Sequence, residues 1–316
     1  MAEGLTNASY TINSELKNVY ADYVNDYKAK NPKQTMMEQF MHPKPPMPEY
    51  AMENDMITKQ ASANDVAIIS IGRNAGEGKD RKVEDDFTLT KTEQSLIKNV
   101  ANAFHAQNKK VVVVLNIGGV IEVASWRDEV DGILLAWQPG LEGGNAMADV
   151  LSGKVNPSGK LATTFPMKYE DVPSAKSFPG KEFPEQATTG SFGRKSIPAE
   201  VTYEDGIYVG YRYYNTFNVK PAYEFGYGLS YSNFTFGNLK LSSSTFNNNI
   251  TSTHTITNQG KVAGKEDVEI DLIAPTTNID TSDEDYKHFT KTNFLNRVKT
   301  KNFKFQCIHY FLPPFN

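Results

Sequence analysis

A continuous run of β-branched residues constrains the fold of this chain more than any other feature. Residues Val111–Leu115 read Val-Val-Val-Val-Leu, without a polar residue among them. A strand that is apolar on both faces is typical of a parallel sheet that lies buried between helices. Two further apolar runs, Val66–Ile71 and Gly132–Trp137, lie before and after it. The chain is therefore expected to build a sheet in this region.

Helical patterns separate the three runs. Thr90 is followed three residues later by Glu93, which is the signature of a capping box, and apolar residues then recur at helical spacing to about Gln107. Further helices are predicted over residues 11–30 (with Ser14 as the cap), 50–60, 120–126 and 145–151. Strands that alternate with helices indicate an α/β fold, a mainly parallel sheet with helices on both faces.

The second half of the chain has a different pattern. A turn at 156–160 leads into a stretch rich in Pro, Gly, Ser and Lys, and closely spaced aromatic residues follow it between Tyr203 and Tyr231. From Asn233 onward, short apolar runs alternate with Asn- and Gly-containing turns, which predicts an all-β sandwich. We expect three parts: 1–190, an α/β domain; 191–232, an aromatic-rich connection; and 233–316, a β domain.

Composition excludes several classes of function. The 316 residues carry a formal charge of −4, without the basic surface that binds nucleic acid, and no apolar run is long enough to span a bilayer. No secretory signal is present as written, so a cytoplasmic location is expected. A single cysteine, Cys307, and five scattered histidines give no metal site, and no phosphate-binding motif is matched, so no cofactor is expected.

One acidic residue stands where chemistry would need it. Glu77 lies between Gly76 and Gly78, directly after the apolar run Val66–Ile71. Ligands bind at the carboxyl ends of the strands in open α/β sheets, and a carboxylate on such a loop has the properties of a general acid. The local alternative is that Glu77 is a solvated loop carboxylate without a role.

Several ordered motifs resemble glycoside hydrolase family 3, in its β-glucosidase and β-xylosidase branch. They are Gly76-Glu77-Gly78-Lys79-Asp80-Arg81, Val113–Gly118, Glu122–Trp126, Leu135–Gly140, Ala148–Leu161, Tyr208–Tyr214, Phe225–Tyr231 and Gly260–Glu266. The resemblance implies a C-terminal α/β sandwich followed by a fibronectin type III-like module. It also implies a retaining β-glycosidase that acts on a β-glucoside or oligosaccharide, with Glu77 as the general acid/base and with Asp80 and Arg81 supporting its loop. Such enzymes need a second carboxylate about 5–5.5 Å away.

The sequence departs from the family at both ends. The family's nucleophile is an aspartate before a tryptophan on a separate barrel, and neither Trp126 nor Trp137 follows an aspartate here. We expect the barrel and the first strand of the α/β sheet to be missing, and the type III-like sandwich to be truncated, with an exposed strand edge.

Three functions are compatible with these features. The first is the C-terminal part of a β-glucosidase-like enzyme, inactive without its barrel partner. The second is a non-catalytic carbohydrate-binding or interaction module that uses the tyrosine-rich stretch. The third is a nucleotide-binding α/β protein, which the missing phosphate motifs disfavour. An oligomer is compatible with each of the three functions. The first function is preferred.

Overall fold

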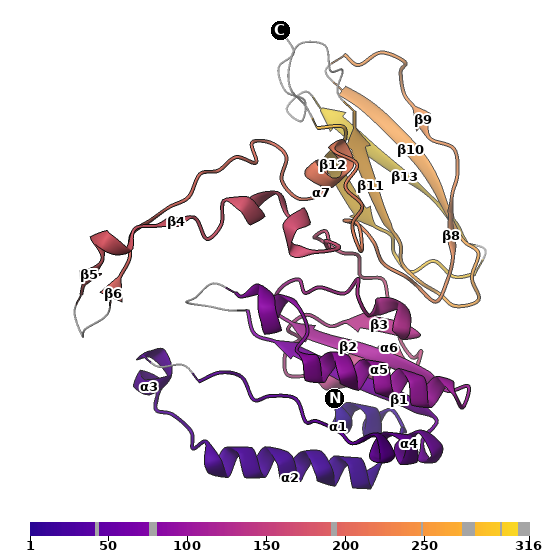
Figure 1. The fold of residues 1–316 in the computed structure, drawn as a ribbon. Helices are drawn as coiled ribbons and strands as arrows, with labels where there is room; N and C mark the ends of the chain where they lie inside the picture. Colours follow the sequence, from indigo (N-terminus) through magenta and orange to yellow (C-terminus); the bar gives the residue numbers. More distant parts are fainter. Residues whose placement is uncertain are drawn as a thin grey trace. The chain divides into compact units, whose positions relative to one another are not determined.

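A computed structural model describes residues 1–41, 44–75, 81–190, 195–247, 249–273, 282–297 and 299–308 (Figure 1). By its internal contacts the chain divides into two compact units, Met1–Leu151 and Ser152–Asn316. Each unit is described by itself. The expected domain boundaries at residues 190 and 232 stay predictions.

The first unit contains a three-stranded parallel sheet. Its strands are β1 (Val66–Arg73), β2 (Lys110–Ile117) and β3 (Gly132–Leu135), in the order β1-β2-β3. Val66 lies opposite Lys110, and Val112 lies opposite Gly132. The side chains of the central strand that are fully or almost fully buried are those of Val111, Val113, Val114, Leu115 and Ile117. The predicted parallel sheet is confirmed, and the buried side chains of β2 contribute most of its core.

Six α-helices of the described residues belong to this unit. They are α1 (Ala2–Asn7), α2 (Ser14–Lys30), α3 (Met36–Met41), α4 (Asn54–Ala63), α5 (Lys91–His105) and α6 (Gly143–Leu151). Helix α5 packs on β1 and β2 through buried residues that include Leu96, Ile97 and Phe104. Helix α1 packs on α6, where a Cβ on Gly4 would lie 2.1 Å from the carbonyl oxygen of Gly144. Cover of the sheet by helices on both faces stays a prediction.

The local predictions had mixed outcomes. The capping box is confirmed, because Thr90 Oγ1 accepts from Glu93 N and a Glu93 carboxylate oxygen accepts from Thr90 N. Helix α2 is capped by Asn13 instead of Ser14, with Asn13 Oδ1 accepting from Leu16 N at 2.9 Å. The helix predicted over 120–126 is wrong: this stretch is a loop with a turn, followed by a 3₁₀ helix at Arg127–Glu129.

The second unit begins with short elements on a long connecting segment. They are three 3₁₀ helices (Tyr169–Asp171, Pro173–Lys176, Pro184–Gln186), the pairs β4 (Lys181–Glu182) with β7 (Ala199–Glu200) and β5 (Thr188–Thr189) with β6 (Lys195–Ser196), and helix α7 (Tyr211–Thr216). Many of the aromatic side chains here pack on one another. Tyr211 contacts Phe225, for example, and both Tyr208 and Tyr213 contact Phe217.

Antiparallel strands follow. Strand β10 (Asn249–Asn258) pairs with β8 (Phe234–Phe236), β9 (Lys240–Leu241) and β13 (Thr300–Ile308), and β11 (Asp267–Leu272) pairs with β12 (Asp285–Lys291). Ile256 of β10, Val268 of β11 and Leu295 form a buried cluster. The fibronectin type III-like character of this region, and its truncation, stay predictions.

No helix in the described ranges is both long and apolar enough to cross a lipid bilayer. Within the same residues, His, Cys, Asp and Glu side chains do not gather in groups of three that could hold a metal ion.

Candidate functional site

Three loops leave the parallel sheet at the same edge. They follow Arg73 at the end of β1, Ile117 at the end of β2 and Leu135 at the end of β3. Since parallel strands have their carboxyl ends at one edge of the sheet, these loops are neighbours, and such an edge is where ligands bind in open α/β sheets.

Two of the three predicted site residues, Glu77 and Asp80, lie outside the described residues. The structure does describe Ala75, just before this segment, and Arg81, just after it. The contacts of these two residues show how the parts of the chain next to this segment are held.

The leading end packs on a glycine of the next loop. A Cβ added to Gly118 would lie 2.7 Å from both the nitrogen and the Cα of Ala75, and Gly118 N donates to Arg73 O at 3.1 Å. Such a close approach requires a residue without a side chain. Gly118 thus holds the end of β1 against the end of β2.

The trailing end is held by Arg81. Its Nη2 and Nε donate to Asp86 Oδ1 at 2.8 and 3.1 Å, and its Nη1 donates to the carbonyl oxygen of Val120 at 2.8 Å. Gly119 makes room for this guanidinium group, since a Cβ there would lie 2.9 Å from Arg81 Nη1. The loop after β1 and the loop after β2 are therefore joined at a second point.

A buried ion pair supports the base of the first loop. Arg73 binds the carboxylate of Glu93 with two hydrogen bonds of 2.7 Å, and its Nε donates to the carbonyl oxygen of Asp86. Both side chains of the pair are 10% exposed. Burial by itself raises the pKa of Glu93, but the hydrogen bonds from Arg73 and Thr90 outweigh burial, and the net pKa is lowered.

Other groups at this edge also have structural partners. The Glu122 carboxylate accepts from Ser125 N and Ser125 Oγ, both at 2.7 Å, and the Glu122 carbonyl oxygen accepts from Trp126 Nε1. After β3, Trp137 has a positive φ of 51° and is 37% exposed, and Asn116 Nδ2 donates to its carbonyl oxygen at 2.6 Å. Glu122 is thus engaged in building its own loop.

The sequence patterns missed most of the residues that hold this site. They identified Arg81, but not Arg73, Asp86, Gly118 or Gly119 as the groups that fix the loops. One signal was available: Gly118 and Gly119 form a glycine pair immediately after a buried parallel strand. The partner carboxylate of Arg73, Glu93, was identified only as part of the capping box.

Comparisons with known proteins identify the family to which this chain is related. Residues 6–231, well over half of the chain, match the family model described as the glycosyl hydrolase family 3 C-terminal domain. β-Glucosidase A of Butyrivibrio fibrisolvens is 35% identical over 72% of this chain. An exo-α-(1→6)-L-arabinopyranosidase of Bifidobacterium longum is 35% identical over 79% of it.

A solved structure gives the same result. β-Glucosidase 3B from Thermotoga neapolitana, in complex with glucose, matches all of this chain with a TM-score of 0.87 and 42% identity. The chain spans 30% of each of the two curated relatives and 42% of the solved one. The family resemblance expected from the sequence motifs is confirmed.

Proposed function

Because the chain belongs to glycosyl hydrolase family 3, we propose that it supplies the general acid/base of a retaining β-glycosidase, with Glu77 in that role. In this reaction one carboxylate attacks the anomeric carbon, and the other protonates the leaving oxygen and then deprotonates the attacking water. The chain contributes the second carboxylate. We assign the nucleophile to a part of the longer relatives that this chain does not match.

The observation that carries the proposal is the anchoring of the Glu77 segment at both ends. Ala75 packs on Gly118, and Arg81 binds Asp86 and the carbonyl oxygen of Val120. A short segment held in this way at the carboxyl edge of a parallel sheet can present a carboxylate toward a substrate bound outside the edge.

The names of the relatives support a proposal for the substrate class. Most of the relatives carry the name β-glucosidase, so we propose a terminal β-linked glucosyl unit as the substrate. Arabinopyranosidases match at a similar identity, so we propose that the sugar is selected mainly by groups outside the shared region. The proposal therefore assigns acid/base chemistry to this chain and sugar selection mainly to the N-terminal part.

Complementation in trans tests the proposal. The part of T. neapolitana β-glucosidase 3B that this chain does not match would be purified, mixed with this chain and assayed on p-nitrophenyl β-D-glucoside. We expect no turnover from either protein alone and measurable turnover from the mixture. Glu77→Gln should lower kcat of the mixture by about 10²- to 10⁴-fold, the usual contribution of general acid–base catalysis.

A neighbouring carboxylate provides the control. Glu84 is exposed and lies seven positions after Glu77, so Glu84→Gln should leave kcat unchanged. Turnover at enzyme-like rates by this chain alone would overturn the proposal, as would a mixture in which Glu77→Gln is as active as the wild type.

A further inference from the structure

The two tryptophans of the chain have opposite surroundings. Trp126 is 3% exposed, and its Nε1 donates to the carbonyl oxygen of Glu122, so its side chain belongs to the core of the first unit. Trp137 is 37% exposed and lies two residues after β3, at the carboxyl edge of the parallel sheet. Burial in the core therefore explains Trp126 but not Trp137.

The backbone of Trp137 lies in the left-handed region, with a φ of 51°. Among the described residues, the other non-glycine residues with a positive φ are Ser9, Asp85, Asn108 and Asn218. Asn and Asp tolerate this region because their short side chains form local hydrogen bonds, whereas a bulky side chain there is strained. Strained residues of this kind cluster at active sites and ligand-binding sites, where the surrounding structure holds them.

The neighbouring strand holds this conformation. Asn116 Nδ2 donates to the carbonyl oxygen of Trp137 at 2.6 Å, and Ala136 N donates to Leu115 O at 2.8 Å. The ladder between β2 and β3 thus continues to the residue before Trp137. The backbone that carries the indole ring is therefore tied to β2.

Trp137 and the loop of Glu77 border the same edge. Arg73 of β1 pairs with Ile117, and Leu115 pairs with Leu135. Since Trp137 follows Leu135 by two residues, as Ile117 follows Leu115, the register places Trp137 level with Arg73 across the sheet. Two strand spacings separate β1 from β3, which is about 10 Å.

The proposed role of Glu77 determines which part of the substrate lies near Trp137. In a retaining glycosidase the nucleophile attacks one face of the anomeric carbon, and the leaving group departs on the side of the acid/base, which protonates it. Groups that border the same edge as Glu77 are therefore expected to face the leaving group. The indole of Trp137 is such a group.

An indole ring suits a leaving group that has a flat face. Tryptophan presents a large apolar face, on which another ring stacks in an offset arrangement, and its polar N–H lies at the rim. An aryl ring has such a face, and a pyranose ring has one made of C–H groups. A small alkyl leaving group has none, so the contact discriminates between leaving groups.

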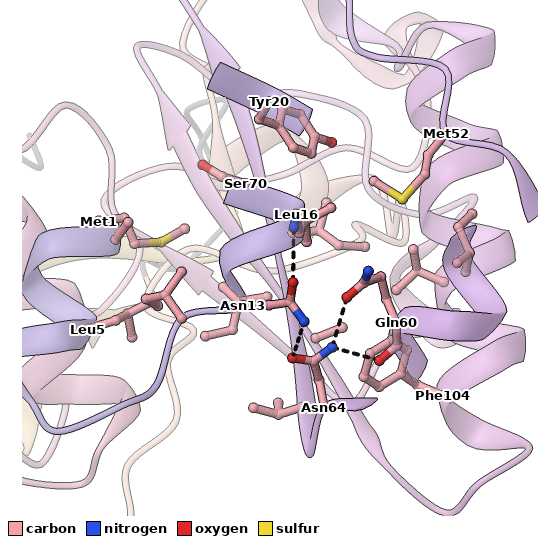
Figure 2. Close-up of a pocket in the computed structure, with 18 of the residues that line it drawn as sticks. Met1, Leu5, Asn13, Leu16, Tyr20, Met52, Gln60, Asn64, Ser70 and Phe104 are labelled. Carbon is pink, nitrogen blue, oxygen red and sulfur yellow. Dashed lines mark hydrogen bonds between the residues drawn. The ribbon is translucent and has the colours of Figure 1, made fainter. Parts of the chain in front are cut away.

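The apolar pocket of the first unit is a poorer site for a glycoside. Its volume is about 440 Å³, and the polar side chains of Asn13, Asn64 and Gln60 at one end bond to one another (Figure 2). Sugar hydroxyls buried there would lack partners, which is costly. The described residues of the three edge loops do not line this pocket.

We propose that Trp137 is a specificity-determining residue that stacks on the leaving group of the glycoside, an aryl ring or the next sugar of a β-linked oligosaccharide. The inference rests on the proposed function, because it takes Glu77 as the acid that protonates the same leaving group. It assigns selection of the leaving group to this chain, whereas selection of the glucosyl unit is proposed for the rest of the enzyme.

Kinetics with three glucosides test the inference. The mixture with the unmatched part of T. neapolitana β-glucosidase 3B would be assayed on phenyl β-D-glucoside, cellobiose and methyl β-D-glucoside. Trp137→Ala should lower kcat/KM by about 10-fold for the first two, the effect of one lost stacking contact, and by less than about 2-fold for the third. Trp137→Phe, which keeps an aromatic face, should retain most of the activity on all three.

Nuclear magnetic resonance gives a second measurement that needs no turnover. When only this chain is isotope-labelled, the mixture shows two labelled indole N–H signals, because the chain has two tryptophans. Phenyl 1-thio-β-D-glucoside, whose sulfur accepts a proton poorly, should shift the signal of Trp137 and leave that of Trp126 in place. Methyl 1-thio-β-D-glucoside should shift the Trp137 signal much less. The signal that Trp137→Phe removes identifies Trp137, and an unchanged Trp126 signal shows that each variant is folded.

Two results would overturn the inference. One is an equal loss of kcat/KM on all three glucosides in Trp137→Ala, which is the result for a residue that only supports the loop. The other is an unchanged Trp137 signal at a saturating concentration of the phenyl thioglucoside.

The inference and the proposed function can fail separately. If Glu77→Gln lowers kcat and Trp137→Ala acts equally on all three glucosides, the inference is wrong while the proposed function stands. If Glu77→Gln is as active as the wild type and Trp137→Ala is selective, the proposed function is wrong while selection by Trp137 stands. In an inactive mixture, the shift of the Trp137 signal decides the inference by itself.

Discussion

At the scale of single residues, Gly118 is the position on which the geometry of the site depends most. A side chain there would meet backbone atoms of Ala75 at 2.7 Å, and a backbone yields less easily than the end of a flexible side chain. We expect Gly118→Ala to lower the free energy of unfolding of the first unit by about 1–3 kcal/mol, the usual cost of overpacking. Tryptophan fluorescence during urea unfolding measures this, since both tryptophans, Trp126 and Trp137, belong to that unit.

Gly140 is the matched control for this variant. It lies in the loop after β3, and a Cβ there would meet nothing within 4 Å. Gly140→Ala should therefore change the stability by a few tenths of a kcal/mol at most. Equal destabilisation by the two variants would mean that the contact between Gly118 and Ala75 does not hold the loop.

Single residues also show where sequence patterns are insufficient. The apolar spacing of residues 120–126 predicted a helix, but Glu122 N donates to Phe87 O at 2.8 Å, and the Glu122 carboxylate binds Ser125. These are tertiary and local side-chain contacts that override a weak helical preference. The cap of α2 was misplaced by one residue, because Asn13 and Ser14 are both good capping residues and only the backbone geometry separates them.

At the scale of elements, the ion pair of Arg73 and Glu93 connects the end of β1 to the start of α5. We expect Glu93→Gln to lower the free energy of unfolding by about 3–5 kcal/mol, because the buried Arg73 guanidinium group loses its charged partner. Urea unfolding followed by tryptophan fluorescence would measure the loss. Glu84→Gln, at an exposed position in the same region, is the control and should have almost no effect.

The same pair predicts a dependence on pH. The pKa of Glu93 is lower in the folded chain than in the unfolded chain, where it lies near 4.3. Its contribution to stability is therefore complete above the unfolded pKa and is lost as the pH falls through the folded pKa. Stability curves measured downward from pH 6 should fall less steeply for Glu93→Gln than for the wild type. Parallel curves would show that Glu93 has the same pKa in both states.

A second ion pair connects a turn to the β region of the second unit. Lys160 Nζ lies 2.8 Å from Glu266 Oε1 and donates to the carbonyl oxygen of Gly228, with both charged side chains less than one-fifth exposed. We expect Lys160→Met to destabilise this unit by about 1–3 kcal/mol, because it leaves a nearly buried carboxylate unpaired. Near-ultraviolet circular dichroism of the tyrosines during urea unfolding would measure this loss of stability. Lys168→Met is the control, and similar effects of both variants would argue against the pair.

The elements themselves were largely predictable. The three parallel strands, α5 with its capping box, and the strands after Asn233 follow from apolar periodicity and turn residues, which are local signals. The ends were less predictable: β3 ends at Leu135, two residues before the predicted end, where Asn116 binds the carbonyl oxygen of Trp137. Contacts of this kind join residues that lie far apart in the sequence.

At the scale of the whole molecule, the chain is less than half as long as the family 3 relatives compared with it above. Retaining glycosidases need two carboxylates. We propose that this chain carries one of them and that its partner carries the other. The loop anchored through Ala75 and Arg81 belongs to the half that this chain is proposed to supply.

Rescue by azide of the Glu77→Ala variant, complemented with the N-terminal part, tests the role of Glu77 most directly. With 2,4-dinitrophenyl β-D-glucoside the leaving group needs little protonation, so a glycosyl-enzyme should accumulate for want of a general base. We predict that azide, which needs no base, restores turnover and yields β-glucosyl azide, whereas Glu84→Ala needs no rescue. Two results would contradict the assignment of Glu77 as the acid/base. One is no acceleration by azide. The other is an α-glucosyl azide product, which is the result expected when the nucleophile is missing.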